Sequence, residues 1–116
     1  METVYIYVIG QECGPVKVGI STKPWSRALT IGTSSPFKVQ LLYCQPFSSR
    51  EEARQFERSF HDVYCDYRMA GEWFNLVADL AIEGIQTAVD IDNHFREMEA
   101  LERRREMQEA RGATRQ

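Results

Sequence analysis

The sequence predicts a small α/β domain, in which helices flank a three-stranded antiparallel sheet, followed by a long C-terminal helix. Three observations support this fold class. Two runs of alternating apolar residues lie close together near the N-terminus, and a third follows at 38–47. Helical periodicity fills the segment after the first two runs and the segments after the third. With 116 residues, 43% of them apolar, the chain has room for one domain and one appended helix.

Residues 4–9 and 16–21 are predicted to form a β-hairpin, because both segments alternate with period two around a short turn containing glycine and proline. The apolar faces that pair are formed by Val4, Ile6, Val8, Val16, Val18 and Ile20. The other face of the hairpin then brings together Tyr7, Lys17 and Gly19. A phenol, an ammonium group and bare backbone on a rigid hairpin make this face a candidate site.

The segment after the hairpin is predicted to be a helix that Ser21 or Thr22 caps and that Gly32 ends. Its expected buried stripe consists of Trp25, Ala28 and Leu29. At about 100° per residue, Arg27 lies roughly 200° from Trp25 around the helix. We therefore expect Arg27 to face solvent or a cleft.

A third strand is expected at 38–47, with Val39, Leu41 and Tyr43 on one face. Two serines followed by two glutamates at 48–52 form overlapping capping boxes, which predict the start of a second helix. Its expected core stripe is Ala53, Phe56, Phe60, Val63 and Tyr64. Glu57 lies about 70° from the centre of this stripe, and His61 follows one turn later on the same flank. Both side chains are placed to reach into a cleft.

Residues 66–75 are expected to break the second helix at Gly71 and to turn Trp73 and Phe74 inward. A helical pattern then runs from Leu76 to about Ala110, which predicts a domain at 1–76 and a C-terminal helix at 77–116. The side chains expected to dock this helix on the domain are Val77, Leu80, Ala81, Ile85 and Ala88. A second stripe, formed by Ile91, Phe95, Met98 and Leu101, is a candidate for pairing two helices, and the charged end is expected to be a solvated helix with intrahelical ion pairs.

Charge and composition limit the possible functions. Residues 1–75 carry eight basic and eight acidic side chains, so the domain is neutral and lacks the basic face of a tight nucleic-acid binder. Three widely spaced cysteines without a CxxC pair indicate reduced thiols and argue against a zinc site. No apolar run approaches the roughly 20 residues that span a bilayer, and no secretory pattern begins the chain. The expected location is the cytoplasm, or the host cytoplasm if the protein is phage-encoded.

Several spaced motifs resemble the GIY-YIG nuclease superfamily across about residues 4–76. The matching positions are Ile6-Tyr7 in the first motif, Val18-Gly19 in the second, Arg27 on the helix eight residues later, and Glu57 in QFERSFH. Lys17 stands where the second motif would have its tyrosine. Together with the strings KxG, ExxxH and GEWF, this lysine resembles a branch of the superfamily found in phages and fungi.

The resemblance implies a metal-dependent endonuclease that hydrolyses nucleic-acid phosphodiester bonds with Mg²⁺ or Mn²⁺. The implied roles are Tyr7 as general base, Lys17 as the cation that lowers its pKa, Arg27 on the phosphate, Glu57 on the metal and His61 on the attacking water or a phosphate. Gly19, Ser21, Lys23 and Asn75 are expected to contact the nucleic acid, although Asn75 is better suited to cap the last helix. The expected partner is DNA, with RNA left open, and the last helix is a candidate contact for a protein partner or a second copy of the chain.

Each of these residues also has a simpler interpretation. Tyr7 is a common strand aromatic, Glu57 can pair with a neighbouring arginine, and His61 can be a hydrogen-bonded boundary residue. The alternative function is therefore a catalytically idle nucleic-acid-binding or protein-binding module of the same fold. The neutral domain favours this alternative, as does Tyr5, which stands where the first motif has glycine. A structural, oligomerising protein is the second alternative.

Overall fold

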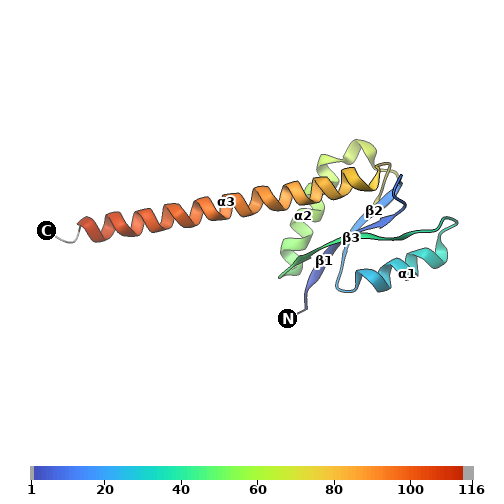
Figure 1. The fold of residues 1–116 in the computed structure, drawn as a ribbon, viewed down its shortest axis with the longest axis horizontal. Coiled ribbons are helices and arrows are strands. Elements are labelled where there is room, and N and C mark those ends of the chain that lie inside the picture. Colours follow the sequence, from blue (N-terminus) through green and yellow to red (C-terminus); the bar gives the residue numbers. More distant parts are fainter. Residues whose placement is uncertain (1, 114–116) are drawn as a thin grey trace. The chain divides into compact units, whose positions relative to one another are not determined.

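The computed structural model describes residues 2–113 and has the predicted α/β fold class, with an antiparallel sheet and a long C-terminal helix. The elements are β1 (Val4–Gly10), β2 (Val16–Ser21), α1 (Pro24–Ser34), β3 (Gln40–Phe47), α2 (Arg50–Val63), a 3₁₀ turn (Cys65–Tyr67), β4 (Trp73–Phe74) and α3 (Ala78–Ala113), as Figure 1 shows. The chain divides into two compact units at Ile85, so that the first turns of α3 belong to the unit with the sheet.

The sheet has four strands in the described residues, in the order β3-β1-β2-β4, and the prediction of three strands is wrong. The additional strand, β4, is only two residues long and pairs with Lys17 and Val16 of β2. The expected inward turn of this segment is confirmed for Phe74, which is fully buried, but its pairing as a strand was not predicted. Two residues are too few for an alternating pattern, so this strand is defined by its partner and not by its own periodicity.

The register of the hairpin confirms the predicted faces. Tyr7 is opposite Gly19 and Ile9 is opposite Lys17, which puts these side chains on one face of the sheet. On this face Tyr7 and Ile9 form a buried cluster with Ala28 and Ile31 of α1. Helix α1 therefore covers the face that carries the candidate site.

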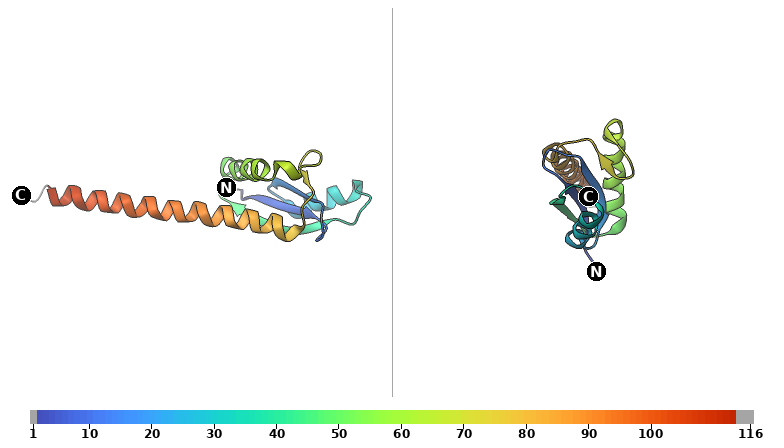
Figure 2. Two further views of the ribbon diagram at one scale, coloured as in Figure 1. Left: turned by 90° about the horizontal axis from the view of Figure 1, so that it is seen from above. Right: turned by 90° about the vertical axis from the view of Figure 1, so that its right-hand side faces the viewer.

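Helix α2 covers the opposite face of the sheet (Figure 2). Phe47 of β3 pairs with Val4 of β1, and its ring stacks on Phe56 of α2 with centroids 4.9 Å apart. The helix begins at the predicted cap, where the Ser49 hydroxyl accepts a hydrogen bond from the Glu52 amide at 3.2 Å. Ala53 and Phe60 of the predicted stripe are buried, whereas Val63 is 70% exposed.

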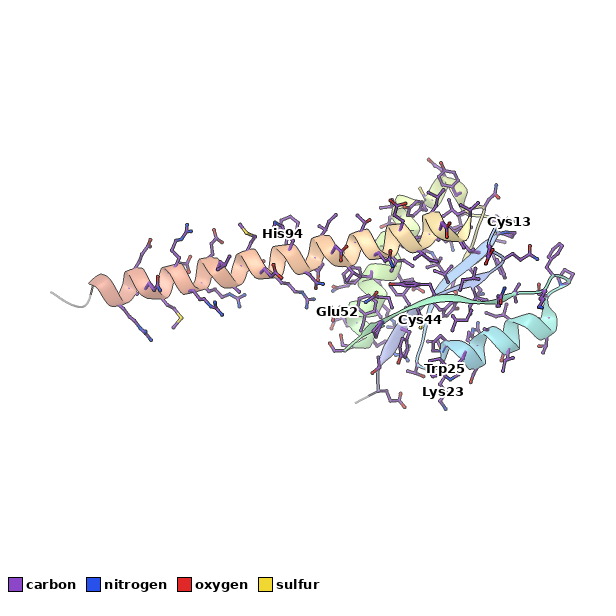
Figure 3. All side chains as sticks on the ribbon, viewed as in Figure 1. Cys13, Lys23, Trp25, Cys44, Glu52 and His94 are labelled. Atoms are coloured by element: carbon purple, nitrogen blue, oxygen red, sulfur yellow. The ribbon has the colours of Figure 1, made fainter. Side chains whose placement is uncertain are left out.

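The predicted buried stripe of α1 is partly wrong. Ala28 is buried as expected, but Trp25 and Leu29 are 53% and 75% exposed, and Ile31 takes the inward position instead. Trp25 instead lies at the N-terminal end of the helix (Figure 3), where its ring packs against the Tyr5 ring in an edge-type arrangement with centroids 5.7 Å apart. Nor does Gly32 end the helix, which continues to Ser34.

A β-bulge in β3 changes the faces expected for that strand. The strand begins at Gln40 and not at residue 38. Tyr43 pairs with Val8, but Leu41 pairs with Ile9, so the residue between them is an extra one. Leu41 and Tyr43 consequently lie on opposite faces, although strict alternation predicted one shared face.

Helix α3 begins at Ala78, so the prediction that Asn75 caps it is wrong. The backbone amide of Asn75 instead donates a hydrogen bond to the Tyr67 carbonyl at 2.8 Å. Of the side chains predicted to dock this helix, Ala81 and Ile85 are buried, whereas Val77 and Leu80 are about half exposed.

In the second unit, α3 has the solvated character expected of its charged end. The predicted stripe of Ile91, Phe95, Met98 and Leu101 is exposed. One intrahelical ion pair, Arg103–Glu99 at 3.9 Å, reaches into this end, and a second, Arg96–Asp92 at 2.9 Å, lies before it. No helix among the described residues is long and apolar enough to span a membrane.

Candidate functional site

The candidate site is centred on the Tyr7 hydroxyl, which lies above the bare backbone of Gly19. Tyr7 is only 1% exposed. A Cβ atom at position 19 would lie 2.5 Å from the Tyr7 hydroxyl and 2.5 Å from Glu72 Oε2, which is too close for any side chain. The glycine of the second motif therefore makes room for a phenol and a carboxylate side by side.

Glu72 joins the groups at this site, although no pattern in the sequence singles it out. The Tyr7 hydroxyl donates to Glu72 Oε2 at 3.3 Å, and Lys17 Nζ lies 3.8 Å from the same oxygen. Lys17 also lies over the ring of Trp73, 6.0 Å from its centroid. The GEWF string was noted only as part of a family resemblance, because no periodicity in that loop indicates where its glutamate points.

The phenol of Tyr7 is a weaker acid than free tyrosine. Burial, followed by the negative charge of Glu72, raises its pKa from 10.0 to about 12, and hydrogen bonding and positive charge from Arg27 oppose this rise. Arg27 is the cation whose charge lowers this pKa, whereas the ammonium group of Lys17, the cation expected to do so, pairs with Glu72. The hydroxyl is therefore protonated at neutral pH.

Glu57 approaches the site from α2, the helix on the other face of the sheet. One of its carboxylate oxygens, Oε2, is buried and has no hydrogen-bond partner among the described residues. Burial, and then the charge of Glu72, raises the pKa of Glu57, while the charges of His61 and two nearby arginines lower it. A buried acceptor without a donor beside a second carboxylate is a place that favours a cation.

The outer edge of β2 connects the two faces at Val18. The Val18 amide donates to the Glu72 carbonyl at 3.1 Å, and the Val18 carbonyl accepts a hydrogen bond from His61 Nε2 at 3.1 Å. The His61 ring also packs against Phe74, with centroids 4.8 Å apart. One residue thus fixes the loop that carries Glu72 and the helix that carries Glu57, and the hydrogen bond gives His61 a structural role whatever its part in chemistry.

The carboxylates fit a divalent cation that uses few protein ligands. Among residues 2–113 no group of three or more His, Cys, Asp or Glu side chains could hold a metal ion. Mg²⁺ is often held by one or two carboxylates, with water and substrate phosphate completing its coordination. The unpartnered Oε2 of Glu57 is the donor that best matches this chemistry.

The remaining predicted contacts lie at two places. Ser21 and Lys23 lie together where β2 meets α1, and the Lys23 amide donates to the Ser21 hydroxyl at 3.0 Å. Lys23 is exposed at the start of the helix (Figure 3). Asn75 is exposed directly after β4.

A row of arginines on α2 was also missed as a functional feature. Arg50, Arg54 and Arg58 recur every four residues, are exposed, and line a shallow cavity of about 460 Å³ with Glu51 and Gln55. Their spacing was visible in the sequence but was interpreted only as a source of partners for Glu57. The neutral domain therefore has a local basic surface after all.

The comparisons with known proteins identify one family. The sequence model of the T5orf172 domain matches residues 2–91, which is most of the chain. This domain is phage-associated and is found in nuclease-related proteins. No curated protein and no solved structure matches the chain significantly.

Proposed function

The chain belongs to the T5orf172 domain family, and on that basis we propose that it is a metal-dependent endonuclease of the GIY-YIG type. The observations that carry this proposal are the hydrogen bond from the Tyr7 hydroxyl to Glu72 and the positive charge of Arg27 at that hydroxyl. The third is the buried, unpartnered oxygen of Glu57, whose carboxylate lies in the field of Glu72. Phosphoryl transfer requires a proton acceptor, a cation for the phosphate and help for the leaving oxygen. These groups supply that set.

Arg27 is the residue that binds the scissile phosphate in this proposal. Its guanidinium group offers several donors in a fixed plane and stays charged at every pH of interest. Arg27 also lowers the pKa of the Tyr7 hydroxyl through hydrogen bonding and positive charge. A phosphate held by Arg27 is therefore next to the group that takes a proton from the attacking water.

Glu57 would hold the divalent cation, Mg²⁺ or Mn²⁺, which supplies charge neutralisation at the phosphate and a more acidic bound water. Positive charge near Glu57 also removes the repulsion between the two carboxylates. Tyr7 is the proposed general base, and Glu72 opposes this role in the protein alone because it stabilises the protonated phenol. Anything that draws the Glu72 charge away from Tyr7 makes the phenol a better base.

The arginine row on α2 supports nucleic acid as the substrate. Arg54 and Arg58 flank Glu57 along the helix and contribute positive charge to it. Exposed arginines at one-turn spacing match a phosphate backbone, which they bind without reading sequence. We therefore propose weakly sequence-dependent cleavage, with DNA as the first substrate to test.

A catalytically idle binding module of the same fold is the second candidate, and the protonated phenol favours it. A hydroxyl with a pKa of about 12 holds its proton at neutral pH. In such a module Tyr7, Glu72 and Lys17 form a structural cluster, and the arginine row binds phosphates.

Nicking of supercoiled plasmid in Mg²⁺ or Mn²⁺ separates the two candidates. We expect the wild type to nick and Tyr7→Phe or Glu57→Gln to lose about 100-fold or more of the rate, since general bases contribute about 10²–10⁴-fold. Glu83→Gln, which changes an exposed glutamate of α3 outside the arginine row, is the matched control and should nick normally. Mn²⁺ binding followed by electron paramagnetic resonance should be lost in Glu57→Gln alone. Wild-type nicking that survives Glu57→Gln, or plasmid binding without any nicking, would refute the catalytic proposal.

A further inference from the structure

A groove of about 440 Å³ adjoins the candidate site on the α1 side of the sheet. Its walls come from the hairpin, from α1 with the loop after it, and from β4. The side chains that matter for binding are Lys17, Arg27, Thr30, Ser34, Phe37 and Trp73. The volume lies in the range of small-molecule sites in proteins.

The charges that line the groove favour an anion. Lys17 and Arg27 both contribute to its wall, and none of the lining residues in the described part of the chain is acidic. Lys17 pairs with Glu72 at 3.8 Å, so Arg27 is the cation with the greater capacity for a ligand. The same wall includes Thr30 and Ser34, whose hydroxyl groups donate to the Ser26 and Ile31 carbonyls within α1.

The groove also has an aromatic platform. Phe37 is 62% exposed on the loop between α1 and β3, although a phenylalanine gains by burial. Its backbone amide donates to the Ser35 hydroxyl at 3.2 Å, which holds the loop at this point. Trp73 lies on the other side of β2 from β1 and is half-buried, with Lys17 over its ring. Phe37 is therefore the ring with a face available for stacking.

We propose that this groove binds a single unstacked nucleotide, with its base on Phe37 and its phosphate on Arg27. An anion site next to an exposed aromatic ring matches the chemistry of a nucleotide, because every base has a flat face that stacks on aromatic side chains.

This inference specifies the substrate of the proposed nuclease and rests on that function through Arg27, which both sites share. A base in the groove next to the scissile phosphate has left its stack. A paired base in a regular duplex can enter only at the cost of unpairing and unstacking. The preferred substrate is therefore single-stranded nucleic acid or a strand that is unpaired at the cleavage position.

Fluorescence anisotropy of the full chain with a fluorescein-labelled dT12 strand, without divalent metal, tests the proposal in the absence of cleavage. We expect dT12 to bind at least about fivefold more tightly than a hairpin duplex of equal charge, and Phe37→Ala to weaken dT12 binding by about fivefold or more. Phe95→Ala removes an equally exposed phenylalanine (63%) from α3 and should leave dT12 binding unchanged. Because Phe37 is exposed, its variant should fold, which circular dichroism checks.

Three results would overturn the proposal that the groove binds a nucleotide. The chain could bind the duplex as tightly as dT12, Phe37→Ala could weaken binding of both substrates equally, or Phe37→Ala could have no effect on dT12 binding. Competition by inorganic phosphate as effective as competition by thymidine monophosphate would also overturn it, because an anion site alone would then explain the binding. The two proposals fail separately. Plasmid nicking that is insensitive to Phe37→Ala refutes nucleotide binding in the groove but not the proposed nuclease activity. Binding of dT12 that depends on Phe37, without any nicking, refutes the nuclease activity but not the nucleotide-binding groove.

Discussion

Replacing Glu72 by glutamine tests the electrostatics of the site directly. Glutamine keeps the size and one hydrogen-bond acceptor of the side chain but removes the charge that lies 3.3 Å from the Tyr7 hydroxyl. Because that charge raises the pKa of Tyr7, its removal should lower the pKa. The size of the effect follows from the distance and from the screening around the two oxygens.

Two unit charges 3.3 Å apart repel by about 1.3 kcal/mol at the dielectric constant of water and by about 5 kcal/mol at an effective value of 20. The larger energy alone would raise the pKa by almost four units, at about 1.4 kcal/mol per unit. That exceeds the whole rise from 10.0 to about 12, of which burial is the first cause. The smaller energy fits, as does the 36% exposure of the Glu72 side chain. We therefore expect Glu72→Gln to bring the pKa of Tyr7 to about 11.

Titration of ¹³Cζ-labelled tyrosine by nuclear magnetic resonance measures this pKa, and Tyr7→Phe identifies the signal. Glu12→Gln, which removes an exposed carboxylate in the hairpin turn, should leave it unchanged. Glu72→Gln should also narrow the pH range over which the protein loses stability at alkaline pH, because the folded and unfolded pKa values of Tyr7 then lie closer together. A group whose pKa is raised by folding stabilises the protein fully below its unfolded pKa of about 10 and loses that contribution as the pH rises through its folded pKa. A Tyr7 signal that titrates identically in wild type and Glu72→Gln would refute this account of the site.

Two further predictions concern the backbone under the phenol and the arginine row. Gly19→Ala should destabilise the protein by about 1–3 kcal/mol in urea denaturation, because its Cβ would overlap the Tyr7 ring. Gly32→Ala in α1, where the added Cβ would lie 3.7 Å from its nearest neighbour, Val39 Cγ2, should stabilise the protein by up to about 1 kcal/mol. Similar effects of the two changes would contradict the close packing at Gly19. Arg54→Gln should reduce the magnitude of the slope of log K against log salt concentration for nucleic-acid binding by about one. Arg103→Gln, in the exposed end of α3, should leave this slope unchanged. An unchanged slope in Arg54→Gln would exclude a phosphate contact at Arg54.

Much of the site was predictable because it lies on regular elements. Period two on the hairpin put Tyr7, Lys17 and Gly19 on one face, and the register agrees. The capping box fixed the start of α2 within a residue, and so the position of Glu57 on it. In each case a local pattern repeats often enough to define a face without reference to the rest of the chain.

The failures have a common cause in contacts between distant residues. The extra residue in β3 reverses the faces expected from alternation, and only the pairing with β1 reveals it. Trp25 is a large apolar residue of the kind expected in a core, yet it is half exposed and packs its ring against Tyr5 at the surface. The Glu72 side chain is in a turn, where no period applies, and its direction depends on β4 pairing with β2.

The sequence by itself determined which residues could take part in chemistry and which face of the hairpin they share, because strand and helix periods are local properties of the chain. Only the tertiary structure decided that Glu72 links the phenol to the lysine and that the free carboxylate oxygen belongs to Glu57. It also decided that the phenol is a weaker acid than free tyrosine, since burial and the charge of a residue 65 positions away raise its pKa. Burial and charge proximity arise from the packing of distant segments, and no pattern along the chain encodes them.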